Sequence, residues 1–444
     1  MEIKMPFFKL GKAHVPHKKN TAEMEAVRMP APEAVAIPMV MHIGAPSNPT
    51  VNVGDKVYVG TKIAEAGGYV GAPIHSSVSG TVKKIDKFLS SNGRSCMSVV
   101  IESDGEMTPD ESVKAPKVTN LDEFCDAVRA SGLVGLGGAG FPTAVKLDAA
   151  KKGLLKVAVI NGAECEPYIT SDTRTMLDDT DYIVKGAGYL KKYLGIEEVV
   201  FGIEKNKPSA IAKLTEAFSG DAFVKIVKLP STYPQGAEKI LIHNTTGRVV
   251  PEGGLPSDVG CLVLNVTSLA FIAKYMETGM PLVEKRITVD GSAIKNPMNV
   301  TVPIGTSIKD VLAFTENPTD DIAKVLYGGL MMGVAIYSLD DPILKNTNAI
   351  VALNKRDALT PKTFPCIHCG RCVQICPMGL NPTLYAKAMK VEDKTERADR
   401  LTDAKLGLCM ECGCCSFVCP SRRPLVETNR IAKAELRNIQ SAKK

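Results

Sequence analysis

Short apolar runs alternate with segments of helical periodicity through the middle of the chain, from about residue 116 to residue 280. Four runs have the length and apolar content of buried strands: LLKVAVI (154–160), EVVFGI (198–203), FVKIVKL (223–229) and CLVLNV (261–266). The stretches KPSAIAKLTEAF, GAEKILIHNT and SLAFIAKYMETG have the spacing of helices. Asn120 and Glu123 form a capping-box pattern that opens a further helix, LDEFCDAVRASG. This alternation predicts an α/β domain over residues 116–280.

Residues 31–115 have a different pattern, in which short alternating segments are separated by Gly-Asp and Ser-Gly turns. Segments such as PTVNVGDKVYVGTKIAEA and SVSGTVKKI predict hairpins in a small β domain. The phrases VNVGDKV and GAPIHSSVSGTV resemble the barrel-sandwich hybrid fold of biotinyl and lipoyl carriers. The acceptor lysine of those carriers is absent, so we expect a structural or docking domain and not a swinging arm.

Two further segments flank these domains. Residues 281–359 open with KRITVDGSAIKNPMNVTVPIGTSIKDVL, which predicts two strands joined at an Asp-Gly turn and then a helix. That order is similar to a β-grasp module of the soluble-ligand-binding type, and we expect it to link its neighbours. Residues 1–30 are polar, and we expect an arm that lies on another surface.

Composition excludes several classes of protein. The chain has 444 residues, so we expect several domains with ample apolar core. No run approaches 18 uninterrupted apolar residues, and the N-terminus has no signal-peptide core, so we expect neither a transmembrane segment nor a leader. No Trp, 5% aromatic residues and no clustered basic stripe argue against nucleic-acid binding.

Two cysteine runs near the C-terminus have the spacing Cys-x₂-Cys-x₂-Cys-x₃-Cys-Pro of bacterial [4Fe–4S] ligands: CIHCGRCVQICP (366–377) and CMECGCCSFVCP (409–420). The fourth cysteine of such a run usually binds the neighbouring cluster. We therefore predict one cluster on Cys366, Cys369, Cys372 and Cys419, and the other on Cys409, Cys412, Cys415 and Cys376. Zinc knuckles and disulfides are the alternatives, and the doubled spacing argues against both.

The cysteine runs affect what the sequence predicts about net charge, redox state and fold. The formal charge is +6, and two clusters would together add about −4, which leaves the loaded chain near neutral. The scattered remaining cysteines, including Cys414 inside the second run, do not form a disulfide framework, which fits a reducing cytosol. The helix-rich segment between the two runs predicts an all-helical dicluster ferredoxin domain over residues 360–444.

A glycine-rich loop, Gly135-Leu-Gly137-Gly138-Ala-Gly140, precedes FPTAVKLDAAKK. The loop formally fits G-x-G-x-x-G, but it follows a helix and not a strand, so it is a poor dinucleotide fingerprint. Its glycines still allow backbone N–H groups to approach a phosphate. The helix expected after the loop would favour negative charge at its start, and Lys146 would add a positive charge.

Three more loops carry polar residues at strand ends or helix starts. Asn161-Gly-Ala-Glu164-Cys-Glu166 follows the first strand, with Asp172 close behind. Tyr233-Pro-Gln-Gly236-Ala-Glu238 opens a helix, and Asn265 ends the last strand. Ligands of α/β sheets bind at the carboxyl ends of strands. Each loop alone could be a solvated loop, but four in one domain predict a cofactor pocket.

GLGGAGFPTAVK and NGAECEP resemble the flavin-binding subunit of complex I, which takes hydride from NADH onto FMN. By motif, the residues that fall where that family holds FMN are Gly135, Gly137, Gly138, Lys146, Asn161, Glu164 and Asn265. Phe141, Glu166 and Glu238 fall where it contacts the nicotinamide nucleotide. Tyr233 and Gly236 match its Tyr-x-x-Gly at the isoalloxazine ring. The chain departs from the family at Ala163, Ala237 and Leu255, mostly on the nucleotide side.

The whole chain resembles the C-subunit family of the Rnf complex, the ion-translocating ferredoxin:NAD⁺ oxidoreductase. HVPHKKNTA, IPMVMHIGAPSNPTVNVGDKV, the flavin loops, the β-grasp segment and the doubled cysteine run appear in that family's order. The resemblance implies a multidomain α/β plus β protein with FMN, two [4Fe–4S] clusters and NAD(H) as substrate. It also implies a peripheral position on the cytoplasmic face of the membrane, beside a ferredoxin-like cluster subunit and flavin-bearing subunits.

The sequence therefore predicts an oxidoreductase in which hydride passes between NAD(H) and FMN and single electrons pass through the clusters to a partner. No acid–base triad is evident, and we assign no catalytic side chain. Two alternatives stay open: a soluble flavin and iron–sulfur cobalamin reductase, and a cluster adaptor without flavin.

Overall fold

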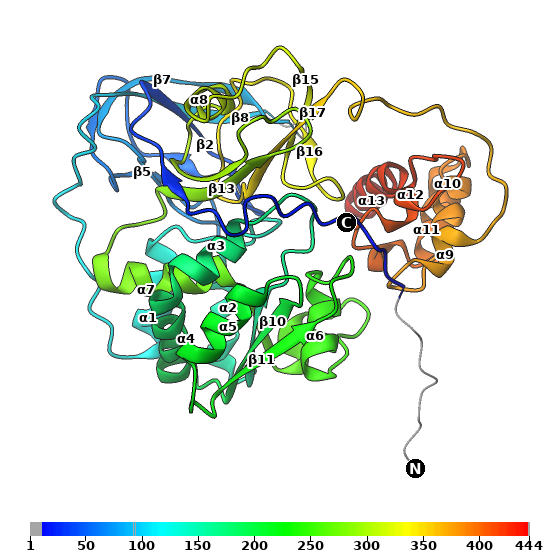
Figure 1. Ribbon diagram of the computed structural model, residues 1–444, viewed down its shortest axis with the longest axis horizontal. Helices are drawn as coiled ribbons and strands as arrows, with labels where there is room; N and C mark the ends of the chain where they lie inside the picture. Colours follow the sequence, from blue (N-terminus) through cyan, green and yellow to red (C-terminus); the bar gives the residue numbers. More distant parts are fainter. Residues whose placement is uncertain (1–10, 92, 94, 443–444) are drawn as a thin grey trace.

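The computed structural model describes residues 11–91, 93 and 95–442 of the chain. In Figure 1 an α/β unit, drawn in teal and green, lies beside β-rich units drawn in blue and yellow. A small helical domain, drawn in orange and red, lies to one side of them. The arm expected at residues 1–30 and the domain expected at residues 360–444 both extend beyond the described residues, which exclude 1–10 and 443–444.

A four-stranded parallel sheet forms the centre of the α/β unit, in the order β11-β10-β9-β12. Its strands are β9 (Val157–Gly162), β10 (Glu198–Glu204), β11 (Val224–Leu229) and β12 (Cys261–Asn265). Parallel strands are covered on both faces, which explains why they are nearly continuous Val, Ile and Leu runs. The four strands predicted from the sequence are confirmed, with small shifts at their ends.

Seven α-helices accompany this sheet in the described residues. They are α1 (Leu121–Ala130), α2 (Thr143–Leu147), α3 (Ser171–Asp178), α4 (Thr180–Leu194), α5 (Pro208–Ala217), α6 (Glu238–Thr246) and α7 (Val266–Thr278). The Asn120 side chain caps α1 as predicted, by accepting a hydrogen bond from the Glu123 backbone N–H. The helix expected after the glycine loop is shorter than predicted. It stops at Leu147, and the chain continues through a turn into a short 3₁₀ helix (Ala150–Lys152), where Ala149 and Ala150 pack against the core.

The blue β-rich unit contains two antiparallel sheets, β2-β8-β7-β4 and β3-β5-β6. Its strands are β2 (Ala34–Pro38), β3 (Asn48–Pro49), β4 (Lys56–Val57), β5 (Lys62–Glu65), β6 (Ile74–His75), β7 (Gly80–Leu89) and β8 (Ser95–Ser103). Its buried side chains, among them Val35, Ile37 and Ile101, belong to the same hydrophobic core as Phe124 and Ile160 of the α/β unit. The two units are therefore packed as one body.

A six-stranded mixed sheet, in the order β1-β14-β13-β17-β15-β16, forms the second β-rich unit. Its elements are β1 (Val27–Arg28), β13 (Glu284–Asp290), β14 (Met298–Pro303), α8 (Ile308–Phe314), β15 (Ile322–Tyr327), β16 (Val334–Ala335) and β17 (Ala349–Asn354). Strand β1 comes from the N-terminal segment and pairs in parallel with β14. Val27–Arg28 thus form an edge strand of a sheet whose other strands lie within residues 284–354.

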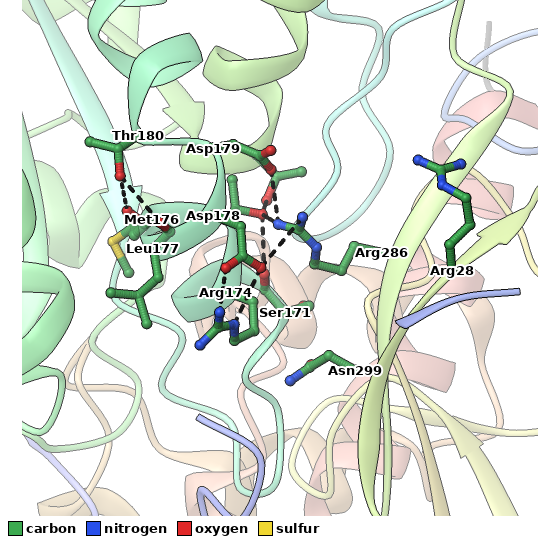
Figure 2. Close-up of polar contacts among 12 residues, drawn as sticks. Arg28, Ser171, Arg174, Met176, Leu177, Asp178, Asp179, Thr180, Arg286 and Asn299 are labelled. Atoms are coloured by element: carbon green, nitrogen blue, oxygen red, sulfur yellow. Dashed lines mark hydrogen bonds and ion pairs between the residues drawn. The ribbon is translucent and has the colours of Figure 1, made fainter. Parts of the chain in front are cut away.

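Helix α3 is fixed to this mixed sheet by Arg286 of β13 (Figure 2). The guanidinium of Arg286 donates to Asp179 Oδ2 at 2.9 Å and to Thr175 Oγ1 at 3.2 Å. Arg174 pairs with Asp178 on the same helix and also donates to the backbone oxygen of Ala22 at 3.3 Å. These contacts hold α3 between the mixed sheet and the N-terminal segment.

The helical domain contains α9 (Arg371–Gln374), α10 (Pro382–Ala388), α11 (Lys394–Asp403), α12 (Cys414–Phe417) and α13 (Leu425–Ala442). Its small core includes Tyr385, Leu401 and Ala432. After Asn354 the described residues contain no strand. In Figure 1 the segment before α9 swings around the outside of the molecule to reach this domain. Within the described part of the chain, no helix has both the length and the apolar character needed to cross a membrane.

Candidate functional site

The glycine-rich loop lies between α1 and α2 and packs on two neighbouring units. The Gly135 N–H donates to Phe141 O at 2.9 Å and closes the loop on itself. Gly140 has a left-handed φ of +70°, and its oxygen accepts from the Ile43 N–H of the β-rich unit at 3.2 Å. A Cβ on Gly137 would lie 2.5 Å from Asn265 Nδ2, whereas one on Gly138 would meet nothing within 4 Å. The loop therefore needs glycine at Gly137 and leaves an open backbone surface at Gly138.

Lys146 and Glu238 lie beside each other near this loop. The Lys146 ammonium donates to Val263 O of β12 at 3.1 Å and lies 3.5 Å from Glu238 Oε2. Glu238 is exposed in the first turn of α6, and Phe141 is half-buried. The structure therefore places one cation and one anion at an accessible rim of the α/β unit.

The carboxyl ends of β9 and β12 carry the two predicted asparagines. Asn161 donates to Gly236 O at 2.9 Å and accepts from the Ala163 N–H at 3.1 Å, so it joins two of the predicted loops. Asn265 caps α7 and donates to Asp172 Oδ2 at 2.8 Å. The loops predicted separately from the sequence thus meet at one edge of the sheet, as ligand sites in parallel sheets do.

Glu164 is buried beneath this edge with a left-handed φ of +47°. Its carboxylate accepts from the Asp172 N–H at 2.6 Å and from the Thr173 hydroxyl at the start of α3. Burial raises the pKa of Glu164, and the nearby ammonium groups of Lys19 and Lys207 oppose that rise. The geometry favours Glu164 as the residue that fixes the loop, with its side chain facing the protein.

Lys19 of the N-terminal segment holds the same loop and was not predicted. Its ammonium donates to three backbone oxygens, those of Glu164 at 2.7 Å, Glu166 at 2.8 Å and Ile169 at 2.6 Å. Burial is the main reason that the pKa of Lys19 is lowered to about 8; Glu164 opposes this shift, and the Lys207 charge adds to it. Lys19 lies in the segment HVPHKKNTA, which carries the family resemblance but no information about its contacts.

Lys207 supports the loop from the other side, at the start of α5. Its ammonium donates to Ala163 O at 2.6 Å and lies 3.3 Å from Glu204 Oε2. Three buried atoms on adjoining loops have no hydrogen-bond partner among the described residues: Glu204 Oε1, Asn206 Nδ2 and Gln235 Nε2. Buried polar groups normally have partners, so these orphaned atoms fit a site that takes a polar ligand or ordered water.

Glu166 and Tyr233 face away from the exposed rim. The Glu166 carboxylate accepts from the N–H groups of Met331 and Met332, both at 2.9 Å, and from the Tyr233 hydroxyl at 3.5 Å. Burial raises the pKa of Glu166, and the two N–H groups oppose that rise. None of its hydrogen bonds among the described residues involves Phe141 or Glu238. The three residues predicted to contact one nucleotide are therefore not joined by hydrogen bonds.

The eight predicted cluster cysteines line two separate cavities in the helical domain. One cavity is bordered by Cys376, Cys409, Cys412 and Cys415. The other, larger cavity is bordered by Cys366, Cys369, Cys372 and Cys419. Among the described residues, no group of three or more His, Cys, Asp or Glu side chains is placed to hold a single metal ion. The four predicted ligand thiols at each cavity are the donor set that a [4Fe–4S] cluster takes, and Cys414 lines the first cavity as a fifth thiol.

The smaller cavity adjoins the predicted flavin loops through an apolar cluster. Cys412 and Cys414 pack with Cys165 and Tyr233 of the α/β unit and with Ala13 of the N-terminal segment. Cys414 Sγ lies 3.9 Å from Tyr233 O. The Gly236 N–H also lies 3.4 Å from Cys165 Sγ, so the predicted isoalloxazine loop is tied to the same cluster. The two halves of the candidate site are thus in contact.

Comparison with known proteins identifies these parts. The model of the RnfC barrel sandwich hybrid domain matches residues 8–106. The model of the Nuo51 FMN-binding domain matches residues 128–274. The model of the 4Fe-4S dicluster domain matches residues 362–423. The chain therefore contains an FMN-binding domain and a dicluster domain, which agrees with the cofactors predicted from its motifs.

A solved structure, an NAD+-reducing [NiFe]-hydrogenase in the air-oxidized state, has a similar fold with a TM-score of 0.50 at 19% sequence identity. The similarity covers 71% of this chain and 63% of that one. It bears on the fold alone.

Two curated relatives are similar over most of their length. The C subunit of the Na(+)-translocating ferredoxin:NAD(+) oxidoreductase complex of Acetobacterium woodii is 41% identical over 443 residues, which is 98% of both chains. The C subunit of the proton-translocating ferredoxin:NAD(+) oxidoreductase complex of Clostridium ljungdahlii is 42% identical over 83% of this chain and 81% of its own length. The chain belongs to the family of C subunits of ion-translocating ferredoxin:NAD(+) oxidoreductase complexes.

Proposed function

We propose that the chain is the peripheral electron-input and electron-output subunit of a membrane ion-pumping ferredoxin:NAD⁺ oxidoreductase. It exchanges hydride between NAD(H) and FMN and passes single electrons through two [4Fe–4S] clusters to a partner subunit. The observation that carries the proposal is the contact between the cysteine-lined cavity of the second run and the loops at the carboxyl edge of the α/β sheet.

The FMN assignment rests on the loops that meet at that edge. Bound FMN would supply the step from a two-electron hydride to single electrons. The backbone of the glycine loop, Lys146, Asn161 and Asn265 would provide donors for its phosphate and ring atoms. The orphaned Gln235 and Asn206 amides are further donors on the adjoining loops. Glu164 would act by fixing the loop that carries them.

The nucleotide side is proposed at the exposed rim, where Phe141 and Glu238 are accessible beside Lys146. Glu166 would then act differently from its neighbours, because its carboxylate is held by the 331–332 backbone next to Tyr233. We propose that Glu166 links the flavin loop to the cluster side of the site.

For the finer organisation we propose an arm at 1–30, a barrel-sandwich domain at 31–115, an FMN/NADH domain at 116–280, a β-grasp domain at 281–359 and an all-helical dicluster domain at 360–444. The expected partners are membrane subunits, including a ferredoxin-like cluster subunit and flavin-bearing subunits. We propose a position on the cytoplasmic face of the membrane, since the relatives are subunits of ion-translocating complexes.

Anaerobic titration of the reconstituted full chain with NADH tests the function. NADH should bleach the flavin absorbance, and the EPR signals of reduced clusters should follow. If dithionite reduces the clusters while NADH never bleaches bound flavin, the nucleotide assignment is wrong. Chain that takes up clusters but no flavin would indicate a cluster adaptor.

A further inference from the structure

The two cysteine runs have the same backbone, so their residues can be compared position by position. Gly370 and Gly413 have φ values of +72° and +80°, and each precedes a helix of four residues, α9 or α12. His368 and Glu411, one residue before the second cysteine of each run, also have left-handed φ values of +55° and +58°. In this alignment Ile367 corresponds to Met410, and Arg371 to Cys414.

The two copies have opposite surroundings. In the second run, Met410 and Cys414 pack against the α/β unit together with Tyr233 and Cys165, and Cys414 is 1% exposed. In the first run, Ile367 is 66% exposed and Arg371 is also exposed. The cavity of the second run therefore faces the flavin loops, and the cavity of the first run faces solvent. This asymmetry also accounts for Cys414, which fills the inward position where the outward copy carries an arginine.

We define the exit face as the surface around the first run formed by the exposed residues Lys362, Phe364, Ile367, Arg371 and Arg422 and the half-buried Arg423. Thr363 and Phe364 hydrogen-bond to the backbone of Arg422 and Ser421, so the two segments lie side by side. Phe364 is 50% exposed, which gives the face an apolar centre together with Ile367.

All the charged side chains of the exit face are positive. Residues 358–391 and 412–426 contain no Asp or Glu. None of the four cations of the exit face forms an ion pair with the described residues. Unpaired cations around an apolar centre attract an oppositely charged partner and orient it before contact.

We propose that the exit face docks an acidic iron–sulfur protein domain, and that the cluster of Cys366, Cys369, Cys372 and Cys419 is the one that exchanges electrons with it. This inference rests on the proposed function. One electron leaves the reduced cluster of this chain and reduces the oxidised cluster of the partner, and no proton or bond changes hands. The inner cluster, on Cys376, Cys409, Cys412 and Cys415, stands between that step and the flavin site.

Reversing two exit-face charges that do not border the cavity tests the proposal. The variant is Lys362→Glu combined with Arg422→Glu in the reconstituted full chain. The matched control is Lys83→Glu combined with Lys87→Glu, two exposed residues of β7 with the same change in charge. Each protein is reduced with dithionite, freed of excess reductant and mixed in a stopped-flow instrument with an oxidised, acidic bacterial [4Fe–4S] ferredoxin at several NaCl concentrations.

We expect the second-order rate of the unaltered chain to fall as salt increases. At low salt the exit-face variant should be slower by about 10-fold or more, whereas the control should stay within about twofold of the unaltered chain. Equal rates for variant and control, or a rate that does not depend on salt, would overturn the proposal. So would a variant that loses binding to anionic vesicles but keeps its rate with ferredoxin, since the face would then serve a membrane surface. Because NADH takes no part, this outcome is independent of the titration that tests the proposed function.

Discussion

Lys19 shows how much of the candidate site depends on a single side chain from outside the flavin domain. Its ammonium is held by three carbonyl oxygens that lie within six residues of one another, at Glu164, Glu166 and Ile169. Such a contact makes one rigid turn out of a segment that has no regular secondary structure. The chain bends sharply there, with left-handed φ values at Glu164 and Tyr168.

Replacing Lys19 with Met should loosen this turn, because three buried oxygens would lose a charged donor. We expect the free energy of unfolding to fall by about 2–4 kcal/mol and FMN affinity to fall with it. Urea unfolding and FMN titration by fluorescence would measure the two effects. Lys12→Met is the control, since Lys12 is exposed in the same arm. Equal FMN affinity in both variants would contradict the role given to Lys19.

Lys345 is a second buried ammonium, fully enclosed, and it joins the first β-rich unit to the α/β unit. It donates to Pro73 O at 2.6 Å and to Gly132 O at 2.8 Å. Burial lowers the pKa of Lys345 to about 7. His75 lies beside it, and burial together with the Lys345 charge lowers the pKa of that imidazole to about 3.

This pKa predicts the direction of a pH effect on stability. Between about pH 7 and the ordinary lysine value of 10.5, the unfolded chain holds a proton at this position that the folded chain has released. Raising the pH through this window therefore stabilises the fold, with a slope approaching about 1.4 kcal/mol per pH unit. The difference in unfolding free energy between the unaltered chain and Lys345→Met, measured from pH 6.5 to about pH 10, should grow with pH. A difference that shrinks or stays constant would contradict the prediction.

At the scale of elements, the apolar strands and most helices of the α/β unit were predictable, whereas α3 and α4 were not. Helix α3 buries Asp172 and Thr173, whose polar atoms are satisfied by hydrogen bonds and leave no apolar stripe in the sequence. Helix α4 contains Gly186, a poor helix former. A Cβ there would lie 2.7 Å from Leu269 O, so close packing on α7 decides the residue. Both helices are stabilised by tertiary contacts, and such contacts leave no periodic pattern in the local sequence.

The residues of the candidate site could likewise be predicted only in part. The two groups of four cysteines could be predicted because the ligands of such clusters follow a fixed spacing within each run. The glycine and asparagine loops could be placed because parallel strands end at one edge. Lys19 and Lys207 could not be found, since each acts on backbone oxygens of a distant loop.

Exchange of the fourth cysteine between the two runs gives a prediction about iron content. Cys376→Ser should lose about four of eight iron atoms, and Cys376→Ser with Cys409→Ser should lose no more, because both belong to one cluster. Cys376→Ser with Cys366→Ser should lose nearly all. Iron analysis and EPR after anaerobic reconstitution would measure this. Cys414→Ser is the control and should keep both clusters. If the pair with Cys366 lost no more iron than Cys376→Ser alone, the exchange of ligands would be disproved.

At the scale of the whole molecule, the helical domain is joined to the rest in two ways, by the outer segment before α9 and by the arm that crosses to it (Figure 1). The arm pairs with Tyr233 through Ala13 and approaches the backbone of the helical domain at Gly11. A Cβ on Gly11 would lie 2.3 Å from Ile375 O. The arm is therefore fitted between the flavin loops and the inner cluster cavity.

A larger residue at this point should separate the two redox parts without altering either. We expect Gly11→Val to leave NADH bleaching of flavin unchanged and to slow the following reduction of the clusters several-fold, as followed by stopped-flow absorbance. Lys12→Ala, the neighbouring exposed position, should leave both phases unchanged. An unaltered cluster phase in Gly11→Val would show that the arm does not set this distance.

The path of the arm has a consequence for how the protein is made. A ribosome releases the N-terminus first, and domains then fold in the order in which they emerge. The partners of Lys19 lie 145 to 150 residues further along, and the backbone that Gly11 meets belongs to Ile375 and Cys376. The first described segment of the chain is therefore among the last to find its place. A nascent chain can make the Lys19 contacts once Ile169 has emerged, whereas the Gly11 contact has to wait for Cys376, so the arm is fixed in two separate stages.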